Sequence, residues 1–248
     1  MWPHRLKLGV ALTSLVFVVT CSAPVHHAQQ SPRSRVAVLH RAALRPVVIG
    51  RATWHADERD VHGKPIYDDS IKAVFVHHTD NPNDYDCTKD VPAMLQAIEE
   101  RHIHDMGWDD VGYNFVVDRC GTIYEGRAGS VDRDVRGAHT EGFNAHTVGI
   151  AALGSFGAGV KVPRPMLEAI AAIAAWKLDP GIDPRGKVRL VSSNGESRYR
   201  KGTTAELDAI SGHRDVYETD CPGAALYADL PWIRQTAARL RQKATWVG

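Results

Sequence analysis

The segment 211–223 combines residue types that can bind a metal ion. It contains His213 and Cys221, an imidazole and a thiol eight positions apart, and Pro222 followed by Gly223 prevents it from forming one regular helix. An imidazole and a thiol presented by a loop suit Zn²⁺, whose catalytic sites use three protein ligands and leave a fourth position for water. The segment therefore predicts a zinc site with one more ligand elsewhere in the chain.

The apolar run 72–78 is the candidate source of that ligand, because it ends in His77 and His78. Its β-branched residues predict a buried strand. Side chains alternate along a strand, so the two histidines point to opposite faces and only one can share an ion with His213 and Cys221. Taken alone, a His–Cys pair or a histidine at a strand end is more often packed or exposed than ligating.

The order of motifs along the chain is more specific than any one of them. Between the two segments lie three further motifs: GWDDVGYNF at 107–115, GTIYEGR at 121–127 and GAHT at 137–140. The ordered set, over about residues 46–243, resembles the peptidoglycan recognition protein family and the zinc amidases that share its fold. The resemblance implies hydrolysis of the amide bond between N-acetylmuramic acid and L-alanine, with Zn²⁺ as cofactor and peptidoglycan or a muropeptide as substrate.

The resemblance also implies roles for single residues at the metal. It selects His77 as the third ligand beside His213 and Cys221. Zinc held there would polarise a carbonyl and lower the pKa of its water. Tyr113 matches a tyrosine that faces the metal and can orient the attacking water or donate to the oxyanion. Thr219 occupies a position where a hydroxyl can help to stabilise negative charge.

Four further residues are expected to bind the substrate. The resemblance places His139, Thr140 and Asn144 along the peptide groove and His78 beside the site. Relatives that discriminate between diaminopimelate and lysine in the stem peptide commonly carry Gly-Trp or Asn-Phe after the Gly-Arg dipeptide. Residues 128–129 are Ala-Gly, which matches neither pattern.

Two other functions fit parts of the pattern. Many family members bind peptidoglycan without cleaving it, but in those members the position of Cys221 is commonly serine, so the cysteine favours an enzyme. The other alternative is a thiol hydrolase with Cys221 as nucleophile and His213 as base. It leaves the histidine at the end of the strand without a role, and the Pro-Gly after the thiol predicts no helix N-terminus that would lower its pKa.

Length and charge predict one exported domain. The chain has 248 residues, 44% of them hydrophobic, which is enough for a sizeable core. Its formal net charge of +1 provides no broad basic field for nucleic acid. A short basic region before the apolar run 8–19, which is too short to span a bilayer comfortably, predicts a signal peptide.

We therefore predict a signal peptide at 1–23, a linker or disordered arm at 24–45, and a peptidoglycan recognition or amidase domain at 46–248. The mature chain is expected to have no transmembrane segment and to be secreted, periplasmic or associated with the cell wall. A faint lipoprotein-like box before Cys21 makes a lipid anchor the minor alternative.

The cysteines outside the signal region and the proposed metal site are Cys87 and Cys120. In an oxidising compartment they are expected to form a disulfide. It would close a loop of roughly thirty residues and stabilise the fold by about 3 to 4 kcal/mol. Two buried thiols are the alternative.

Strands and helices alternate along the chain. Expected strands are 47–54, 72–78, 113–118, 122–125, 147–154 and 207–210, and expected helices are 91–106, 165–178 and 230–243. A further hairpin is expected within 188–199, with its turn at Asn194-Gly195. This arrangement predicts an α/β domain with a mixed central β-sheet flanked by helices.

Overall fold

The structure is a computed structural model of the whole chain, and it describes residues 43–246. The predicted signal peptide and nearly all of the predicted linker lie outside the described residues. Within residues 43–246, no helix is both long and apolar enough to cross a membrane.

The domain is built on a five-stranded sheet with the order β3-β2-β4-β1-β7. Its strands are β1 (Ala73–His78), β2 (Phe115–Val117), β3 (Ile123–Glu125), β4 (Thr147–Ala152) and β7 (Ile210–Gly212). β1 pairs in parallel with β4 and β7, β2 pairs in parallel with β4, and β3 is antiparallel to β2. The sheet is therefore mixed, as predicted, and β1 lies inside it with a parallel neighbour on each side.

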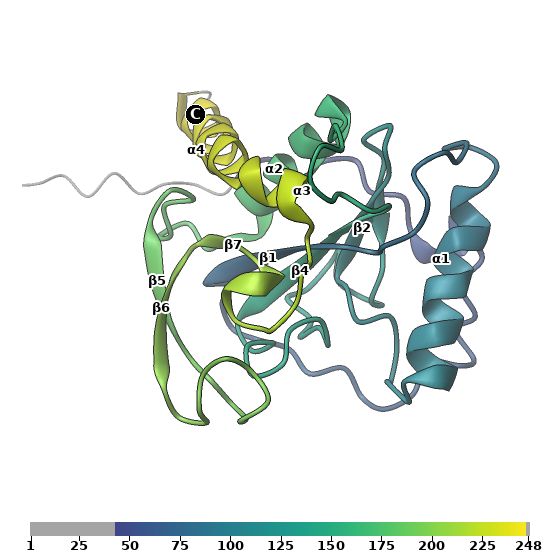
Figure 1. Cartoon of the computed structure of the whole chain (residues 1–248), viewed down its shortest axis with the longest axis horizontal. Coiled ribbons are helices and arrows are strands. Elements are labelled where there is room, and N and C mark those ends of the chain that lie inside the picture. Colours follow the sequence, from purple (N-terminus) through teal and green to yellow (C-terminus); the bar gives the residue numbers. More distant parts are fainter. Residues whose placement is uncertain (1–42, 247–248) are drawn as a thin grey trace, which may run out of the picture. The chain divides into compact units, whose positions relative to one another are not determined.

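Four α-helices accompany the sheet: α1 (Val91–Glu100), α2 (Arg164–Lys177), α3 (Ala224–Ala228) and α4 (Leu230–Trp246). Figure 1 shows α2 and α4 together on one side of the sheet and α1 apart from them. Phe115 of β2 packs on Trp176 of α2, whereas the next residue, Val116, belongs to the cluster that contains Leu95 of α1. The alternation along β2 thus buries one side chain on each face of the sheet.

The short helical segments connect these elements. They are η1 (Arg51–Trp54), the π-helical turn η2 (Arg101–Asp105) that continues α1, and η3 (His213–Asp215). Gly107 ends the α1–η2 helix with φ +68°, a left-handed conformation that favours glycine. The predicted helix 91–106 is confirmed apart from its last turns, which are π-helical.

The predicted strand at 47–54 is wrong. Only Ile49 forms an isolated bridge, to Tyr124, and the chain then turns into η1. The turn buries Arg51, whose guanidinium bonds to the carboxylates of Glu99 and Asp110. Trp54 is a packing anchor as expected, 1% exposed, with its indole N–H donating to a backbone carbonyl.

The predicted hairpin within 188–199 is also wrong. β5 (Lys187–Val191) pairs with β6 (Thr204–Asp208) in a separate two-stranded sheet, and Asn194-Gly195 lies in the long loop between them. A tight Asn-Gly hairpin turn needs positive φ at both residues. Neither residue has it, and the Asn194 side chain accepts the N–H of Glu196 in a local turn.

The other expected elements are confirmed with ends shifted by a few residues, except that the strand expected at 207–210 is divided between β6 and β7, which belong to different sheets. The predicted Cys87–Cys120 disulfide is present and links the loop after β1 to the β2–β3 turn.

Candidate functional site

The carboxyl end of β1 supplies the first candidate ligand. His77 is 1% exposed and lies on the same face of β1 as Phe75. His78 turns to the other face, where its Nδ1 accepts the backbone N–H of Phe156 at 3.4 Å. Alternation therefore separates the two histidines, as expected from the sequence, and only His77 faces the cluster described below.

The pairing of β7 with β1 brings His213 beside His77. Gly212 is in register with Val76, so the residues that follow them lie at the same level of the sheet. The ring centroids of His77 and His213 are 4.5 Å apart. Asp215 holds the turn by accepting the backbone N–H of Gly212 at 2.9 Å, which fixes η3 directly after the strand.

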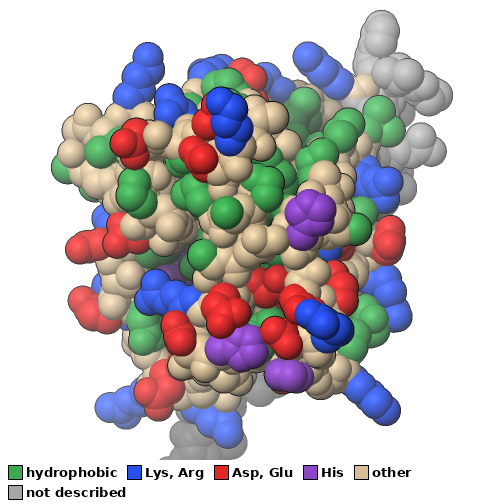
Figure 2. Space-filling view, turned by 90° about the vertical axis from the view of Figure 1, so that its right-hand side faces the viewer, with side chains coloured by type: hydrophobic (Ala, Val, Ile, Leu, Met, Phe, Trp, Pro, Cys, Tyr) green, Lys and Arg blue, Asp and Glu red, His purple; other side chains and the backbone are tan. Residues whose placement is uncertain are grey.

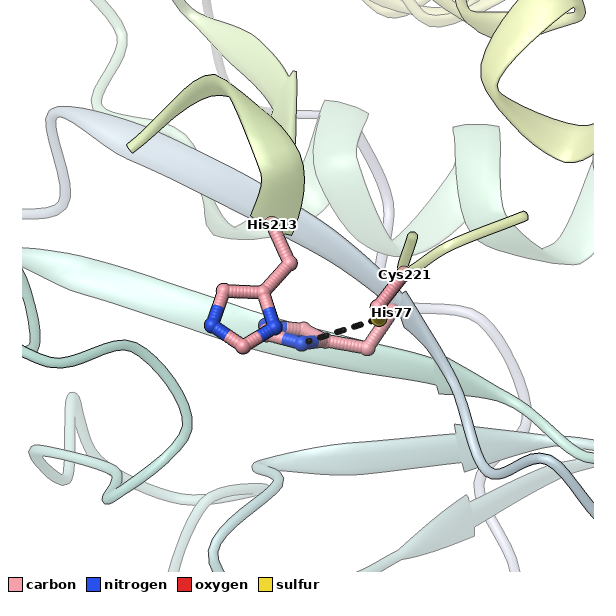
Figure 3. A group of neighbouring side chains, drawn as sticks. All are labelled: His77, His213 and Cys221. Carbon is pink, nitrogen blue, oxygen red and sulfur yellow. Dashed lines mark hydrogen bonds between the residues drawn. The ribbon is translucent and has the colours of Figure 1, made fainter. Parts of the chain in front are cut away.

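Cys221 reaches the same point from the loop that follows η3. Its Sγ is 3.7 Å from His77 Nδ1 and accepts the backbone N–H of His78 at 3.3 Å. The loop is fixed by a hydrogen bond from the Arg214 N–H to the Cys221 carbonyl at 3.0 Å. Figure 3 shows the three side chains pointing toward one another from a strand, a helical turn and a loop.

The three donor groups fit a zinc ion. One donor atom from each of His77, His213 and Cys221 lies within 4.8 Å of the other two. Tetrahedral Zn²⁺, with Zn–S about 2.3 Å and Zn–N about 2.05 Å, places nitrogen and sulfur about 3.6 Å apart. The 3.7 Å between His77 Nδ1 and Cys221 Sγ is close to that separation. Two imidazoles and one thiol also match the ligand types that zinc prefers.

Burial keeps the three groups uncharged in the metal-free protein. It lowers the pKa of His77 well below its usual value and that of His213 to about 4. It also raises the pKa of the Cys221 thiol to about 12. α3 begins at Ala224, shortly after the thiol, but nothing lowers the pKa of Cys221 below its usual value, in agreement with the prediction, and burial leaves the thiol a poor nucleophile.

Tyr113 lies beside this cluster. Its ring is 5.3 Å from the ring of His77 and 5.3 Å from that of His102, measured between centroids. Burial raises the pKa of Tyr113 above its usual value, so the hydroxyl keeps its proton at neutral pH. The structure therefore places a hydrogen-bond donor next to the candidate ligand His77.

Thr219 is half-buried at the other side of Cys221. Its Oγ1 accepts the backbone N–H of Cys221 at 3.2 Å, which leaves its own proton for another partner. Together with Arg214 and Asp220, among others, Thr219 also lines a surface pocket of about 640 Å³. The hydroxyl thus borders both the cluster and solvent.

Two of the residues expected along the peptide groove lie directly against His77. His139 and Thr140 are 5% and 1% exposed, and both contact the ring of His77 from inside the protein. Asn144 Oδ1 accepts the backbone N–H groups of His139 and Thr140 at 2.9 and 2.8 Å, so it holds their loop. Their contact with the substrate stays a prediction.

His102 borders the site but was not singled out from the sequence. It is 7% exposed, packs on Trp108 with ring centroids 4.7 Å apart, and its Nδ1 accepts the backbone N–H of Gly112. Trp108 in turn lines a cavity of about 270 Å³ that Arg127 and Lys64 also border. From the sequence, His102 fits the apolar stripe of a helix, which gives no indication of this contact.

A second group of possible metal donors lies on the surface near α1. Figure 2 shows acidic and histidine side chains gathered on that face, with basic groups among them. Asp60, Glu100 and His104 are mutually close, but all three are substantially exposed and His104 already pairs with Asp60 at 3.0 Å. Surface ion pairing accounts for their arrangement.

The fold and the cluster define a class of protein. A mixed sheet with flanking helices, and a His/His/Cys group at the carboxyl ends of β1 and β7, is the arrangement that the sequence resemblance implied. A family model described as N-acetylmuramoyl-L-alanine amidase (Amidase_2) matches residues 67–224, a span that contains the whole cluster. The chain belongs to this family, in which peptidoglycan recognition proteins and type 2 amidases share one fold.

Named relatives agree with this assignment. The chain is 30% identical over 158 residues to peptidoglycan-recognition protein LB of Drosophila melanogaster, covering 63% of this chain and 56% of that protein. It is 29% identical over 184 residues to the N-acetylmuramoyl-L-alanine amidase of Sus scrofa, covering 73% of this chain and 26% of the relative. Among solved structures, a mutant of Drosophila PGRP-LB in complex with tracheal cytotoxin matches with TM-score 0.57 and 26% identity, over 74% of this chain and 92% of that one.

Proposed function

We propose that the protein is a zinc-dependent N-acetylmuramoyl-L-alanine amidase that hydrolyses the amide bond between N-acetylmuramic acid and L-alanine in peptidoglycan. The observation that carries the proposal is the convergence of His77, His213 and Cys221 from three separate segments of the family domain. A merely structural role for the three would not require two imidazoles and a thiol within 4.8 Å of one another.

The three residues are proposed to hold Zn²⁺ as two neutral imidazoles and one thiolate. When bound, zinc supplies a Lewis acid for the scissile carbonyl and lowers the pKa of a water molecule. The backbone N–H of His78, 3.3 Å from Cys221 Sγ, stabilises the thiolate by donating to it.

Tyr113 and Thr219 are proposed to act on the substrate. The Tyr113 hydroxyl, which burial keeps protonated, donates a hydrogen bond to the carbonyl oxygen as negative charge develops on it. The Thr219 hydroxyl retains a proton that it can donate in the same way. Tyr113 therefore serves as a donor and not as a general base.

The alternative is a protein that binds peptidoglycan without cleaving it. It is supported by the many relatives named as recognition proteins, one of which is solved in complex with tracheal cytotoxin. Against it stands the complete set of three donors together with Tyr113, because a protein that only binds has no need of a metal and a proton donor beside the scissile bond.

We further propose that the protein is exported by its N-terminal 23 residues and acts outside the cytoplasm, with 24–45 as a linker to the domain at 46–248. The Cys87–Cys120 disulfide supports an oxidising compartment.

Digestion of purified muropeptides followed by mass spectrometry tests the activity. The enzyme releases intact glycan and free stem peptides, loses this activity in chelator and regains it with Zn²⁺. His213→Ala is expected to be inactive, while His104→Ala, at an exposed histidine outside the cluster, serves as the matched control. Binding of muropeptides without cleavage would establish the protein as a peptidoglycan-binding protein that is not an enzyme. Cleavage that continues unchanged in the chelator would indicate the thiol hydrolase.

A further inference from the structure

We propose that Thr140 and His139 are positioning residues for His77, which hold its ring so that Nε2 carries the proton and Nδ1 is free to bind the metal. The inference rests on the proposed metal site and gives a new role to two residues that the sequence pattern placed in the substrate groove.

Three buried polar groups form a closed triangle beneath the cluster. His77 Nε2 is 3.3 Å from His139 Nδ1 and 3.3 Å from Thr140 Oγ1, and the latter two atoms are 2.9 Å apart. The opposite ring nitrogen, His77 Nδ1, faces Cys221 Sγ at 3.7 Å. The two nitrogens of the His77 ring therefore face different groups: Nε2 faces His139 and Thr140, and Nδ1 faces the other candidate metal ligands.

The chemistry of the groups sets the direction of the hydrogen bonds. A ligating imidazole is neutral, so it has one N–H, and that proton must be on Nε2 if Nδ1 donates its lone pair to a metal. The Thr140 hydroxyl can accept from His77 Nε2 and donate its own proton to His139 Nδ1. This chain pairs His77 Nε2, Thr140 Oγ1 and His139 Nδ1 in one direction and stabilises the tautomer of His77 that zinc binding requires. It puts the one proton of neutral His139 on Nε2, which has no partner.

The way in which His139 is packed shows that the fold is built around its ring. A Cβ at Gly149 of β4 would lie 2.3 Å from His139 Cγ, and a Cβ at Gly137 would lie 2.5 Å from its Cδ2. Both backbone positions therefore leave room for this imidazole. Among the described residues, His139 Nε2 is one of two buried side-chain polar atoms without a hydrogen-bond partner, a burial that costs about 1–3 kcal/mol and that an apolar side chain would avoid.

Zinc affinity of variants tests the proposal. Thr140→Val keeps the shape of the side chain but removes the hydroxyl, and it is expected to weaken zinc binding by about 10- to 100-fold in a competition with a chromophoric chelator. Thr140→Ser keeps the hydroxyl and should stay close to wild type. Thr147→Val is the matched control, because Thr147 is also fully buried but its hydroxyl bonds to the backbone carbonyl of Phe143.

A measurement on the unmodified protein covers the case in which Thr140→Val does not fold. Two-bond ¹H–¹⁵N correlation spectra report which ring nitrogen of a neutral histidine is protonated, and His77 is expected in the Nε2–H form before any metal is added. The Nδ1–H form, or Thr140→Val with wild-type zinc affinity, would overturn the inference. Failure of the wild-type protein to bind zinc at all would instead refute the metal site of the proposed function.

Discussion

Replacing Arg51 with methionine is predicted to destabilise the domain severely, because one guanidinium neutralises two buried carboxylates. Arg51 is 5% exposed and lies 2.8 Å from Glu99 Oε1 and 3.1 Å from Asp110 Oδ1, whose side chains are 6% and 3% exposed. A third partner, Glu58 at 2.7 Å, is 57% exposed. The guanidinium also donates to the Gly126 carbonyl.

The size of the destabilisation follows from the charged groups that remain buried after the substitution. Methionine fills much of the volume but leaves the carboxyl groups of Glu99 and Asp110 buried without their cation. Breaking a buried ion pair in this way costs about 3–5 kcal/mol, a large part of the roughly 5–15 kcal/mol that stabilise a typical domain. For a domain of this size the midpoint of thermal unfolding should fall by roughly 6–20 °C.

Urea and thermal unfolding followed by circular dichroism measure the effect. Glu58→Gln is the control, because loss of an exposed partner should cost less than about 1 kcal/mol. The loss in Arg51→Met should also depend on pH. Burial already raises the pKa of Glu99, and loss of the cation raises it further, so the folded state takes up protons more readily than the unfolded state and the deficit shrinks as pH falls from 7 to about 5. A loss below about 1 kcal/mol at pH 7, or a deficit that grows at low pH, would refute this reasoning.

Three further perturbations test other parts of the molecule. Zinc binding near pH 7 should release at least one proton per ion, because burial raises the pKa of Cys221 to about 12 while the ligand histidines are already neutral. Calorimetry in buffers of different ionisation enthalpy measures the protons released, and a value near zero contradicts the ligand set. Loss of the disulfide in Cys87→Ser/Cys120→Ser should lower the free energy of unfolding by about 3–4 kcal/mol, and an unchanged urea midpoint would contradict this. Gly149→Ala should destabilise the fold by about 1–3 kcal/mol in the same assay, because its Cβ would collide with the ring of His139. Gly157→Ala is the control and should not destabilise the fold, because a Cβ there meets nothing within 4 Å. Equal effects of the two substitutions would contradict this account of how His139 is packed.

The sequence predicts the sheet and the candidate ligands because their signals are local. The run that becomes β1 is apolar over its whole length and ends in His77, and alternation alone separates that residue from His78. His213 and Cys221 have the chemistry of zinc ligands, although such a pair taken alone is more often incidental than ligating. What the family resemblance added is the choice of His77 and the activity.

The errors come from contacts between distant parts of the chain. The segment 47–54 has the composition of a strand, but Arg51 is held by Glu99 and Asp110, which lie far along the chain and override the local preference. Asn194-Gly195 is a turn signal in isolation, yet the loop around it bonds to residues 142 and 216, which keep it open. No pattern of residue types encodes either set of partners.

His139 and Thr140 illustrate a different limit. The motif indicates that they belong to the site, but the motif does not distinguish a side chain that faces the substrate from one that faces a ligand. Burial places both side chains against His77, and that burial depends on Gly149 of β4 and on the pairing of β4 with β1. Gly149, in the next strand along the chain, thus fixes where the ring of His139 can lie.

The register of the sheet accounts for the geometry of the candidate metal site. Val76 is paired with Gly212, so His77 and His213, the residues that follow them, lie at the same level. Parallel pairing within a buried sheet holds this register strongly, because a slip by one residue would turn His77 to the opposite face. Only Cys221 comes from a loop, and two backbone hydrogen bonds, from His78 N–H to its sulfur and from Arg214 N–H to its carbonyl, tie that loop to the same strand ends. The fold alone therefore brings the three donor groups together, which is the preorganisation that a metal site requires.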